Sequence, residues 1–409
     1  MSRVVDGADQ DLELRTCTSA GAALRVRQLV PVFAPGRELP AAIALDAGPV
    51  QIGRRGYARI ALDDDEVSRR HAELAYDAAA ERWLVRDIGS LNGTWVDGAR
   101  IDRAALAHGA VVRIGQTLLV MVDVALPAGQ RLRRESSALR GHSVAMQRLR
   151  GEIALMAEQP MPLLVLGEPG LDRTLVAREL HDGSGRSGPF VPVSCGAVPR
   201  TLAEGERLGP LGELLAEAHG GTLFLDEVCD LPEVMQDELL CAPARSTGHP
   251  PAPSADVRVI AATHRALAPE ATGGLRVELY ERLDGRVLRV PPLRDRRDDI
   301  LDLARGVLDQ HRGGRVALSC RAAEALLLYD WPLNAHELER VLESAAVRAV
   351  DGVIRCWHLP PAIATAPPAA PSSIGSLLHS ALRAGPRAAE AAEAPAPSEA
   401  SGDPAADRG

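Results

Sequence analysis

The feature that most constrains the fold is a series of short apolar stretches that recur, at intervals of about ten residues, between residues 24 and 123. Turn-forming residues separate the stretches, and this pattern is typical of short β-strands joined by tight loops. The stretches are LRVRQLV, PVQIGR, ARIAL, RHAELAY, RWLVRDI, GTWVDG, AVVRIG and TLLVMVD. The sequence therefore predicts an all-β sandwich over residues 24–123, preceded by a flexible N-terminal segment, 1–23.

The pattern changes after residue 123. Residues 124–139 are rich in Arg, Gly and Ser without periodicity, as expected of a linker. Over 140–300, helical patterns alternate with apolar strands, which predicts a parallel sheet covered by helices, and 301–364 is predicted to be helical. Residues 365–409 are dominated by Ala, Pro, Ser, Glu and Gly, a composition that favours disorder, although 373–384 could form a short helix that docks on a partner.

Charge and composition narrow the classes of partner. All 46 basic residues are arginine, so no lysine-dependent site can exist, and the net charge is −9. The arginines are spread along the chain, which argues against direct DNA binding through phosphates. There is neither an apolar run long enough to span a membrane nor a secretory leader, so we expect a cytoplasmic protein.

The cysteines give no sign of a metal site or of a disulfide framework. None of them is spaced as CxxC, which argues against zinc, and we expect reduced thiols. They are Cys17, Cys195, Cys229, Cys241, Cys320 and Cys356.

Three polar clusters lie between the predicted strands of the first domain. They are GRRG (53–56), VSRRH (67–71) and DIGSLNGTWVDG (87–98). A phosphate bound by loops needs a guanidinium and short hydroxyl or amide donors, which Arg54 and Ser68 supply. Asn92 precedes a glycine, as in a tight turn, and can direct its amide at the backbone of an extended peptide.

Taken together, these clusters resemble the forkhead-associated (FHA) family, whose members read phosphothreonine, over residues 24–123. The resemblance implies that Arg54 and Ser68 contact the phosphothreonine, that Asn92 holds the peptide and that Arg69 adds a phosphate contact. It also implies a phosphothreonine-containing partner, such as a Ser/Thr kinase or its substrate. The family's structural positions correspond to Gly53, His71 and Gly93, with His71 bracing the loops. Taken alone, a loop arginine is usually just solvated and an Asn-Gly pair usually just forms a hairpin turn, so no single residue indicates a binding site.

The segment GEPGLDRT (167–174) has the strand–loop–helix context of a phosphate-binding loop. Gly167, Gly170 and Thr174 fit the pattern GxxxxGK[ST], and Thr174 could meet a magnesium ion. However, Asp172 replaces the second glycine and Arg173 replaces the lysine. A carboxylate about 4 Å from a phosphate oxygen costs about 1 to 4 kcal/mol per charge pair. Arginine is not a conservative substitute for lysine. We therefore expect weak ATP binding or none.

Two carboxylates end the apolar strand GGTLFLDE (220–227). Asp226 is suited to an outer contact with Mg²⁺, and Glu227 to polarising an attacking water.

In fixed order, the segments PFVPVSC, GGTLFLDEV, DVRVIAATHR, LRVELYERL, RVPPLRDRRDDI and WPLNAHELERV resemble the AAA+ domain of sigma-54-dependent activators over residues 140–362. The resemblance implies a ring-forming ATPase with homo- or hetero-oligomeric assembly, in which Arg276 and Arg282 act as arginine fingers. His264 stands where a sensor asparagine is usual. His336 stands where the second sensor arginine belongs.

The largest departure from this family is a deletion. Only Pro210 and Leu211 lie between RLG and GELLAEAHGG, where the family carries the GAFTGA loop that grips sigma-54. The helix-turn-helix expected after Ala364 is also missing, unless 373–384 is its remnant. Contact with sigma-54 RNA polymerase is therefore doubtful.

Three hypotheses follow. In the first, a regulator reads phosphothreonine and its AAA+ domain is a scaffold that hydrolyses little or no ATP. In the second, the chain is an active ATPase that remodels sigma-54 RNA polymerase under FHA control. In the third, the AAA+ region has decayed and the chain is only a phosphopeptide adaptor.

Overall fold

The computed structural model describes residues 24–36, 39–46, 48–127, 130, 132–133, 138–197, 210–241, 256–265, 267, 274–284, 286–310 and 316–365. They lie within one compact unit, Met1–Ala369. The segment 373–384, the N-terminal 1–23 and almost all of 365–409 lie outside the described residues.

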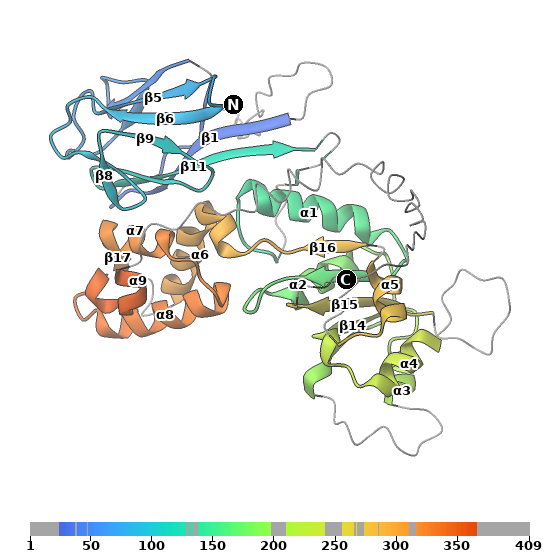
Figure 1. Ribbon diagram of the computed structural model, residues 1–409. Helices are drawn as coiled ribbons and strands as arrows, with labels where there is room; N and C mark the ends of the chain where they lie inside the picture. The colour runs from blue at the N-terminus through green and yellow to red at the C-terminus, as the bar shows by residue number, and fades with distance from the viewer. Residues whose placement is uncertain are drawn as a thin grey trace, which may run out of the picture. The chain divides into compact units, whose positions relative to one another are not determined.

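The N-terminal domain is all-β, as predicted, and consists of two sheets (Figure 1). One sheet has the strand order β2-β1-β11-β10-β7-β8 and the other β4-β3-β5-β6-β9. The strands are β1 (Leu24–Phe33), β2 (Ile43–Ala44), β3 (Val50–Arg54), β4 (Ile60–Leu62), β5 (Ala72–Asp77), β6 (Arg82–Asp87), β7 (Thr94–Val96), β8 (Ala99–Ile101), β9 (Arg103–Leu106), β10 (Val111–Ile114) and β11 (Thr117–Leu126).

Alternation along the strands places one set of side chains between the two sheets. Leu74 on β5 and Trp83 and Val85 on β6 are fully buried there, because residues two apart along a strand share a face. The strands β2, β8 and β9 were not among the predicted stretches, since segments of two to four residues are too short to show a period.

The second domain is built on a parallel sheet with the strand order β13-β14-β15-β12-β16 (Figure 1). Helices α1 and α2 bury apolar side chains in one hydrophobic cluster, and α3, α4 and α5 in another, as expected for a sheet covered on both faces. The strands are β12 (Leu163–Leu166), β13 (Phe190–Ser194), β14 (Thr222–Asp226), β15 (Arg258–Thr263) and β16 (Val287–Arg289). The helices are α1 (Val144–Ala157), α2 (Arg173–Asp182), α3 (Pro210–Glu217), α4 (Glu233–Cys241) and α5 (Val277–Asp284).

The region after β16 is a helical lid, as predicted, with one addition. A two-stranded parallel sheet pairs β17 (Ala317–Leu318) with β18 (Val353–Ile354), within a region expected to be uniformly helical. Strands of two residues leave no periodic signal in a sequence. The helices are α6 (Arg297–Gln310), α7 (Cys320–Leu328), α8 (Asn334–Arg348) and α9 (Pro361–Ala364). Within the described part of the chain, no helix is long and apolar enough to cross a membrane.

Candidate functional sites

The phosphate-reading residues predicted in the FHA domain lie on adjoining loops. Arg54 ends β3, and its backbone N–H donates to the carbonyl of Ser68 at 3.0 Å, so the two predicted contacts are neighbours. A Cβ on Gly53 would lie 2.1 Å from the carbonyl oxygen of Arg69. Only glycine allows this close approach of the two loops. Gly53 therefore lies where the two segments pack closely.

His71 joins the loop that holds Ser68 to the loop that holds Gly93, from inside the domain. It is fully buried, its Nδ1 accepts from the backbone N–H of Ser68 at 3.1 Å, and its Nε2 lies 3.2 Å from the carbonyl of Gly93. Because Nδ1 accepts, Nε2 carries the proton and donates to Gly93. Burial is the main reason that the pKa of His71 lies below its ordinary value.

The third loop is held by Asp87, which the sequence analysis did not single out. Its carboxylate accepts from the hydroxyls of Ser90, at 2.5 Å, and Thr94, at 2.7 Å, and from the backbone of Gly89 and Ser90. Burial opposes ionisation of Asp87, yet these hydrogen bonds lower its pKa to about 2. An Asp followed by Ser and Thr in a Gly-rich loop is a recognisable turn signal.

Two hydrogen bonds join the loop of Ser68 to the loop of Asn92. The Asn92 amide donates to the carbonyl of Glu66 at 2.8 Å, and the Ser68 hydroxyl oxygen accepts from the backbone N–H of Leu91 at 3.1 Å. Gly93 adopts φ 78°, the left-handed conformation that its turn requires. Arg54, Ser68 and Asn92 thus lie on segments of the FHA domain that are hydrogen-bonded to one another.

The guanidinium groups of Arg54 and Arg69 are not paired with carboxylates among the described residues. Arg54 is half-buried and Arg69 is exposed, and neither forms an ion pair with any residue that the structure describes. The Arg69 guanidinium lies 5.1 Å from the ring centroid of Tyr57. A guanidinium held over a ring keeps its in-plane donors free for a phosphate.

In the α/β domain, the loop between β12 and α2 ends on Asp172. The Asp172 carboxylate caps α2 by accepting from the backbone N–H of Leu175 at 3.0 Å. Asp172 occupies the position of the second glycine in the phosphate-loop pattern. Its carboxylate therefore fills the helix N-terminus, where a bound phosphate would otherwise accept these hydrogen bonds.

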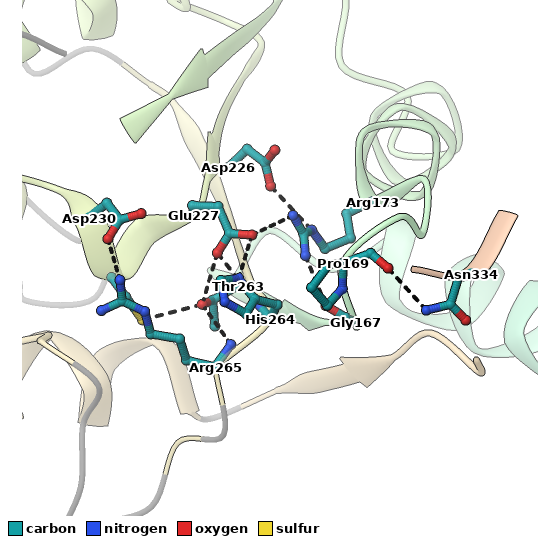
Figure 2. Close-up of polar contacts among 11 residues, drawn as sticks. Gly167, Pro169, Arg173, Asp226, Glu227, Asp230, Thr263, His264, Arg265 and Asn334 are labelled. Carbon is teal, nitrogen blue, oxygen red and sulfur yellow. Dashed lines mark hydrogen bonds and ion pairs between the residues drawn. The ribbon is translucent and has the colours of Figure 1, made fainter. Parts of the chain in front are cut away.

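Arg173 contacts both Asp226, the last residue of β14, and Glu227, which follows it (Figure 2). Its Nη2 is 2.6 Å from Oε1 of Glu227, its Nε is 3.2 Å from Oδ1 of Asp226, and its Nη1 donates to the carbonyl of Gly167 at 2.9 Å. The Arg173 side chain is 9% exposed. Arg173 thus offsets one of the two negative charges and connects the carboxylates to the phosphate loop.

Glu227 uses both carboxylate oxygens within the protein. Oε1 also lies 2.7 Å from Nδ1 of His264, and Oε2 lies 3.3 Å from Oγ1 of Thr263 and from the backbone nitrogen of His264 (Figure 2). Although burial opposes its ionisation, the contacts with His264 and Arg173 lower the pKa of Glu227. Its backbone has φ 54°, an unusual conformation for a non-glycine residue, of the kind found at functional sites.

The phosphate loop is fastened to the lid by residues that the sequence analysis did not single out. Arg294 makes a two-bond ion pair with Glu168, and the Asn334 amide donates to the carbonyl of Pro169 at 3.0 Å. Fully buried Asn334 also accepts from the backbone N–H of Leu293 at 2.9 Å. We call Glu168, Pro169, Arg294 and Asn334 the lid clamp. Asn334 lies in the WPLNAHELE segment and Arg294 in RVPPLRDRRDDI, but nothing in the spacing of these residues marks them as partners of the phosphate loop.

Gly170 shows how closely the loop and the lid approach. A Cβ there would lie 1.9 Å from the carbonyl oxygen of Leu333 and 3.3 Å from Cβ of His336. The predicted sensor His336 is therefore placed beside the phosphate loop, on the first turn of α8, with its side chain exposed. Thr174 is exposed on the first turn of α2.

The two predicted arginine fingers differ in their surroundings. Nη1 of Arg282 donates to the carbonyls of Leu239 and Leu240 at 2.9 and 3.0 Å, at the end of α4. Arg276 is more exposed and lies 2.5 Å from the carboxylate of Asp237. Arg282 therefore has a structural role within its own domain.

Among the described residues, no group of His, Cys, Asp and Glu side chains could hold a metal ion. Cys195, Cys229, Cys320 and Cys356 are free thiols. Burial is the main cause that raises the pKa of Cys195 and of Cys320 to about 12, so both thiols are unreactive.

Comparison with known protein families agrees with this division of the chain. Residues 50–115 match the FHA domain, 139–289 the sigma-54 interaction domain and 294–374 the AAA+ ATPase lid domain.

The chain is 40% identical over 260 residues to the response regulator protein PilR of Pseudomonas aeruginosa, a match that covers 58% of each chain. It is 40% identical over 248 residues to the transcriptional regulatory protein ZraR of Escherichia coli, covering 56% of each. The structure of NtrX from Brucella abortus in complex with ATP is 30% identical, with a TM-score of 0.48, and the match covers 56% of this chain and 58% of NtrX. The chain thus spans a little over half the length of these relatives. It carries an FHA domain, a sigma-54 interaction domain and an AAA+ lid domain, in that order.

Proposed function

We propose that this chain is a phosphothreonine-reading regulator of transcription whose AAA+ domain binds ATP weakly or not at all and serves as an assembly scaffold. The observation that carries the proposal is a contrast between two arginines. Arg54 in the FHA loops forms no ion pair with a described residue, whereas Arg173 in the phosphate loop is paired with both Asp226 and Glu227.

The chemistry of the FHA loops supports phosphate reading. The guanidinium groups of Arg54 and Arg69 can each donate two hydrogen bonds to a phosphate dianion. The Ser68 hydroxyl oxygen already accepts from Leu91, which leaves the hydroxyl hydrogen to donate to a ligand. Asn92 is exposed beside Ser68 and can bond the backbone of an extended peptide.

The residues of the phosphate loop do not suit a magnesium nucleotide. The carboxylate of Asp172 takes the helix N-terminus that a phosphate would need, and it would repel phosphate oxygens. Arg173 forms an ion pair with Asp226, so the carboxylate that would face a metal ion is already paired. Both carboxylate oxygens of Glu227 also have partners within the protein. No catalytic step is therefore assigned to ATP or Mg²⁺ in this chain.

The partners proposed for this chain follow from these two sites. The FHA loops would bind a protein phosphorylated on threonine, either a Ser/Thr kinase or its substrate. The AAA+ domain would assemble with further copies of itself or with an active relative, and so alter transcription without turnover of its own. The transcriptional regulators PilR and ZraR, which match this domain, support a role in transcription.

Phosphate reading is tested by titrating the full chain with threonine-phosphorylated peptides and with their unphosphorylated forms. Arg54→Ala and Ser68→Ala should each weaken binding more than about tenfold, since each removes a charged or direct hydrogen bond to the phosphate. Arg82→Ala, at the opposite end of β6 from the loops, is the matched control and should leave binding unchanged. Equal affinity for both peptide forms would rule the proposal out.

The scaffold role is tested by ATP binding and hydrolysis. We compare the wild type with Glu227→Ala and with the double variant Asp172→Gly/Arg173→Lys, which restores the pattern of the loop. The proposal expects little binding in the wild type and a gain of binding in the double variant. ATP hydrolysis by the wild type that is abolished in Glu227→Ala would instead support the second hypothesis, an active ATPase. Sigma-54 RNA polymerase would then be the first remodelling target to test.

A further inference from the structure

The outer face of one FHA sheet is covered, although strands of a two-sheet sandwich commonly leave that face to solvent. All four residues of β10 are buried. Val112 and Ile114 belong to the cluster between the FHA sheets, whereas Val111 packs in the cluster formed by the lid helices. On β11 the same alternation assigns Leu119 to the FHA core and Leu118 to the lid cluster.

A buried ion pair lies at this contact. Nε of Arg113, on β10, is 3.0 and 3.1 Å from the carboxylate oxygens of Glu324, on α7. The two side chains are 10% and 5% exposed. Arg113 also lies 4.3 Å from the ring centroid of Trp95, on β7, and Arg321 of α7 lies 4.9 Å from the same ring. Arg321 also bonds Glu324 at 3.0 Å. Trp95 is thus contacted by a guanidinium from each domain.

Two further contacts extend the interface. Arg297, at the start of α6, donates to the carbonyl of Gly109 at 3.1 Å. A Cβ on Gly98 would lie 3.2 Å from Cδ1 of Leu328, so the FHA turn after β7 approaches α7 closely. The contact is therefore made by several strands and turns of the FHA domain rather than by a single side chain.

We infer that the FHA domain and the lid move as one body, held by the interface of Trp95, Arg113, Arg321 and Glu324. A buried charge pair is stable only while both members are in place, because either charge alone in an apolar contact is strongly unfavourable. Separation of the domains would leave Arg113 and Glu324 unpaired and expose the apolar side chains of β10 and β11. These costs oppose independent motion of the two domains.

This interface connects the two candidate sites. Strand β7 begins two residues after Asn92 and carries Trp95, and the lid carries Asn334 and Arg294 of the lid clamp. Any movement that opens the lid clamp must therefore carry the FHA domain with it. The inference rests on contacts within the chain and does not depend on what the FHA loops bind.

The test follows amide hydrogen exchange of the full chain in increasing urea. If the two domains are one body, β10 and α7 should become exchangeable at the same urea concentration in the wild type. Glu324→Ala should lower that midpoint for β10 as well as for α7, although no FHA residue has been changed. Asp302→Ala, which removes an exposed lid carboxylate paired with Arg305, is the control and should leave the β10 midpoint in place.

Arg321→Ala changes an exposed residue of the same interface and provides a milder variant if Glu324→Ala does not fold. It should lower the β10 midpoint by a smaller amount. Different midpoints for β10 and α7 in the wild type would overturn the inference. So would a folded lid variant whose β10 midpoint is unchanged.

Discussion

Nη2 of Arg173 lies 2.6 Å from Oε1 of Glu227, so the residue in the lysine position of the phosphate loop is bound to the carboxylate that would polarise water. The fork of the guanidinium reaches Asp226 and the carbonyl of Gly167 at the same time, which a single ammonium group would do less well. The charge of the loop is therefore used to stabilise the protein itself.

This arrangement predicts the outcome of Arg173→Met. The change keeps much of the apolar stem but leaves Asp226 and Glu227 close together without a cation. We expect a loss of about 1 to 3 kcal/mol in the free energy of unfolding, below the cost for fully buried pairs because both carboxylates are partly exposed. Urea denaturation followed by circular dichroism measures it. Arg86→Met, in an exposed pair with Glu73, is the control and should cost less than about 1 kcal/mol.

Acid should weaken the loop that carries Asn92. The pKa of Asp87 is lowered to about 2 in the folded protein, below its ordinary value, so its ionised form stabilises the fold. This contribution is complete above about pH 4 and is lost as the pH falls toward 2. After allowance for solvent screening, ionised Asp87 contributes about 1 kcal/mol to the free energy of unfolding. Asp87→Asn should remove this part of the pH dependence of unfolding, and an unchanged acid profile would contradict the assignment.

His71 should also make the stability of the FHA domain depend on pH, but in a higher pH range than Asp87. Its pKa is lowered by burial, so the unfolded chain binds the proton more tightly, and stability falls as the pH drops below about 6.5. His71→Ala would leave the N–H of Ser68 and the carbonyl of Gly93 unpaired in the interior, at a cost of about 2 to 4 kcal/mol. Thermal unfolding at pH 7.5 and 5.5 measures both effects. His336→Ala, an exposed histidine, should change neither.

Much of the fold follows from the sequence because the signals are local. The strands with alternating apolar residues, such as β5 and β6, and the apolar strands β12 and β14 lie where the sequence predicted them. The polar clusters around Arg54, Ser68 and Asn92 were predicted to lie between strands, and in the structure they lie where β3 ends, between β4 and β5, and between β6 and β7. The short strands β17 and β18 depend on tertiary contacts and left no such signal.

Most of the missing parts of the candidate sites are long-range contacts, although the capping of α2 by Asp172 is a local one. Asp172 was expected to repel phosphates, but its capping of α2 depends on the local backbone. The clamp between Asn334 and Pro169 and the pair of Arg113 with Glu324 join segments far apart along the chain. Neither contact can be read from residue spacing, because each depends on how two separately folded elements pack.

The lid clamp predicts a specific effect of Asn334→Ala. The change would leave the N–H of Leu293 and the carbonyl of Pro169 without their partner, at a cost of about 2 to 4 kcal/mol. Exchange of the Leu293 amide and of the loop 167–173 should increase together. Asn92→Ala, which alters an exposed asparagine, should affect neither segment. Unchanged protection of Leu293 in a folded Asn334→Ala variant would contradict the clamp.

The two arginines of LRVELYERL should behave differently even in the monomer. Arg282 donates to the carbonyls that end α4, so Arg282→Ala should cost about 1 to 2 kcal/mol and loosen α4. Arg276→Ala removes a largely exposed pair with Asp237 and should cost less than about 1 kcal/mol. Hydrogen exchange of α4 at a concentration where the chain is monomeric measures the difference. Equal effects of the two changes would show that the contacts of Arg282 with α4 are unimportant. If Arg276→Ala leaves the monomer stable but impairs assembly, and Arg282→Ala does not impair assembly, Arg276 is the arginine available to a neighbouring subunit.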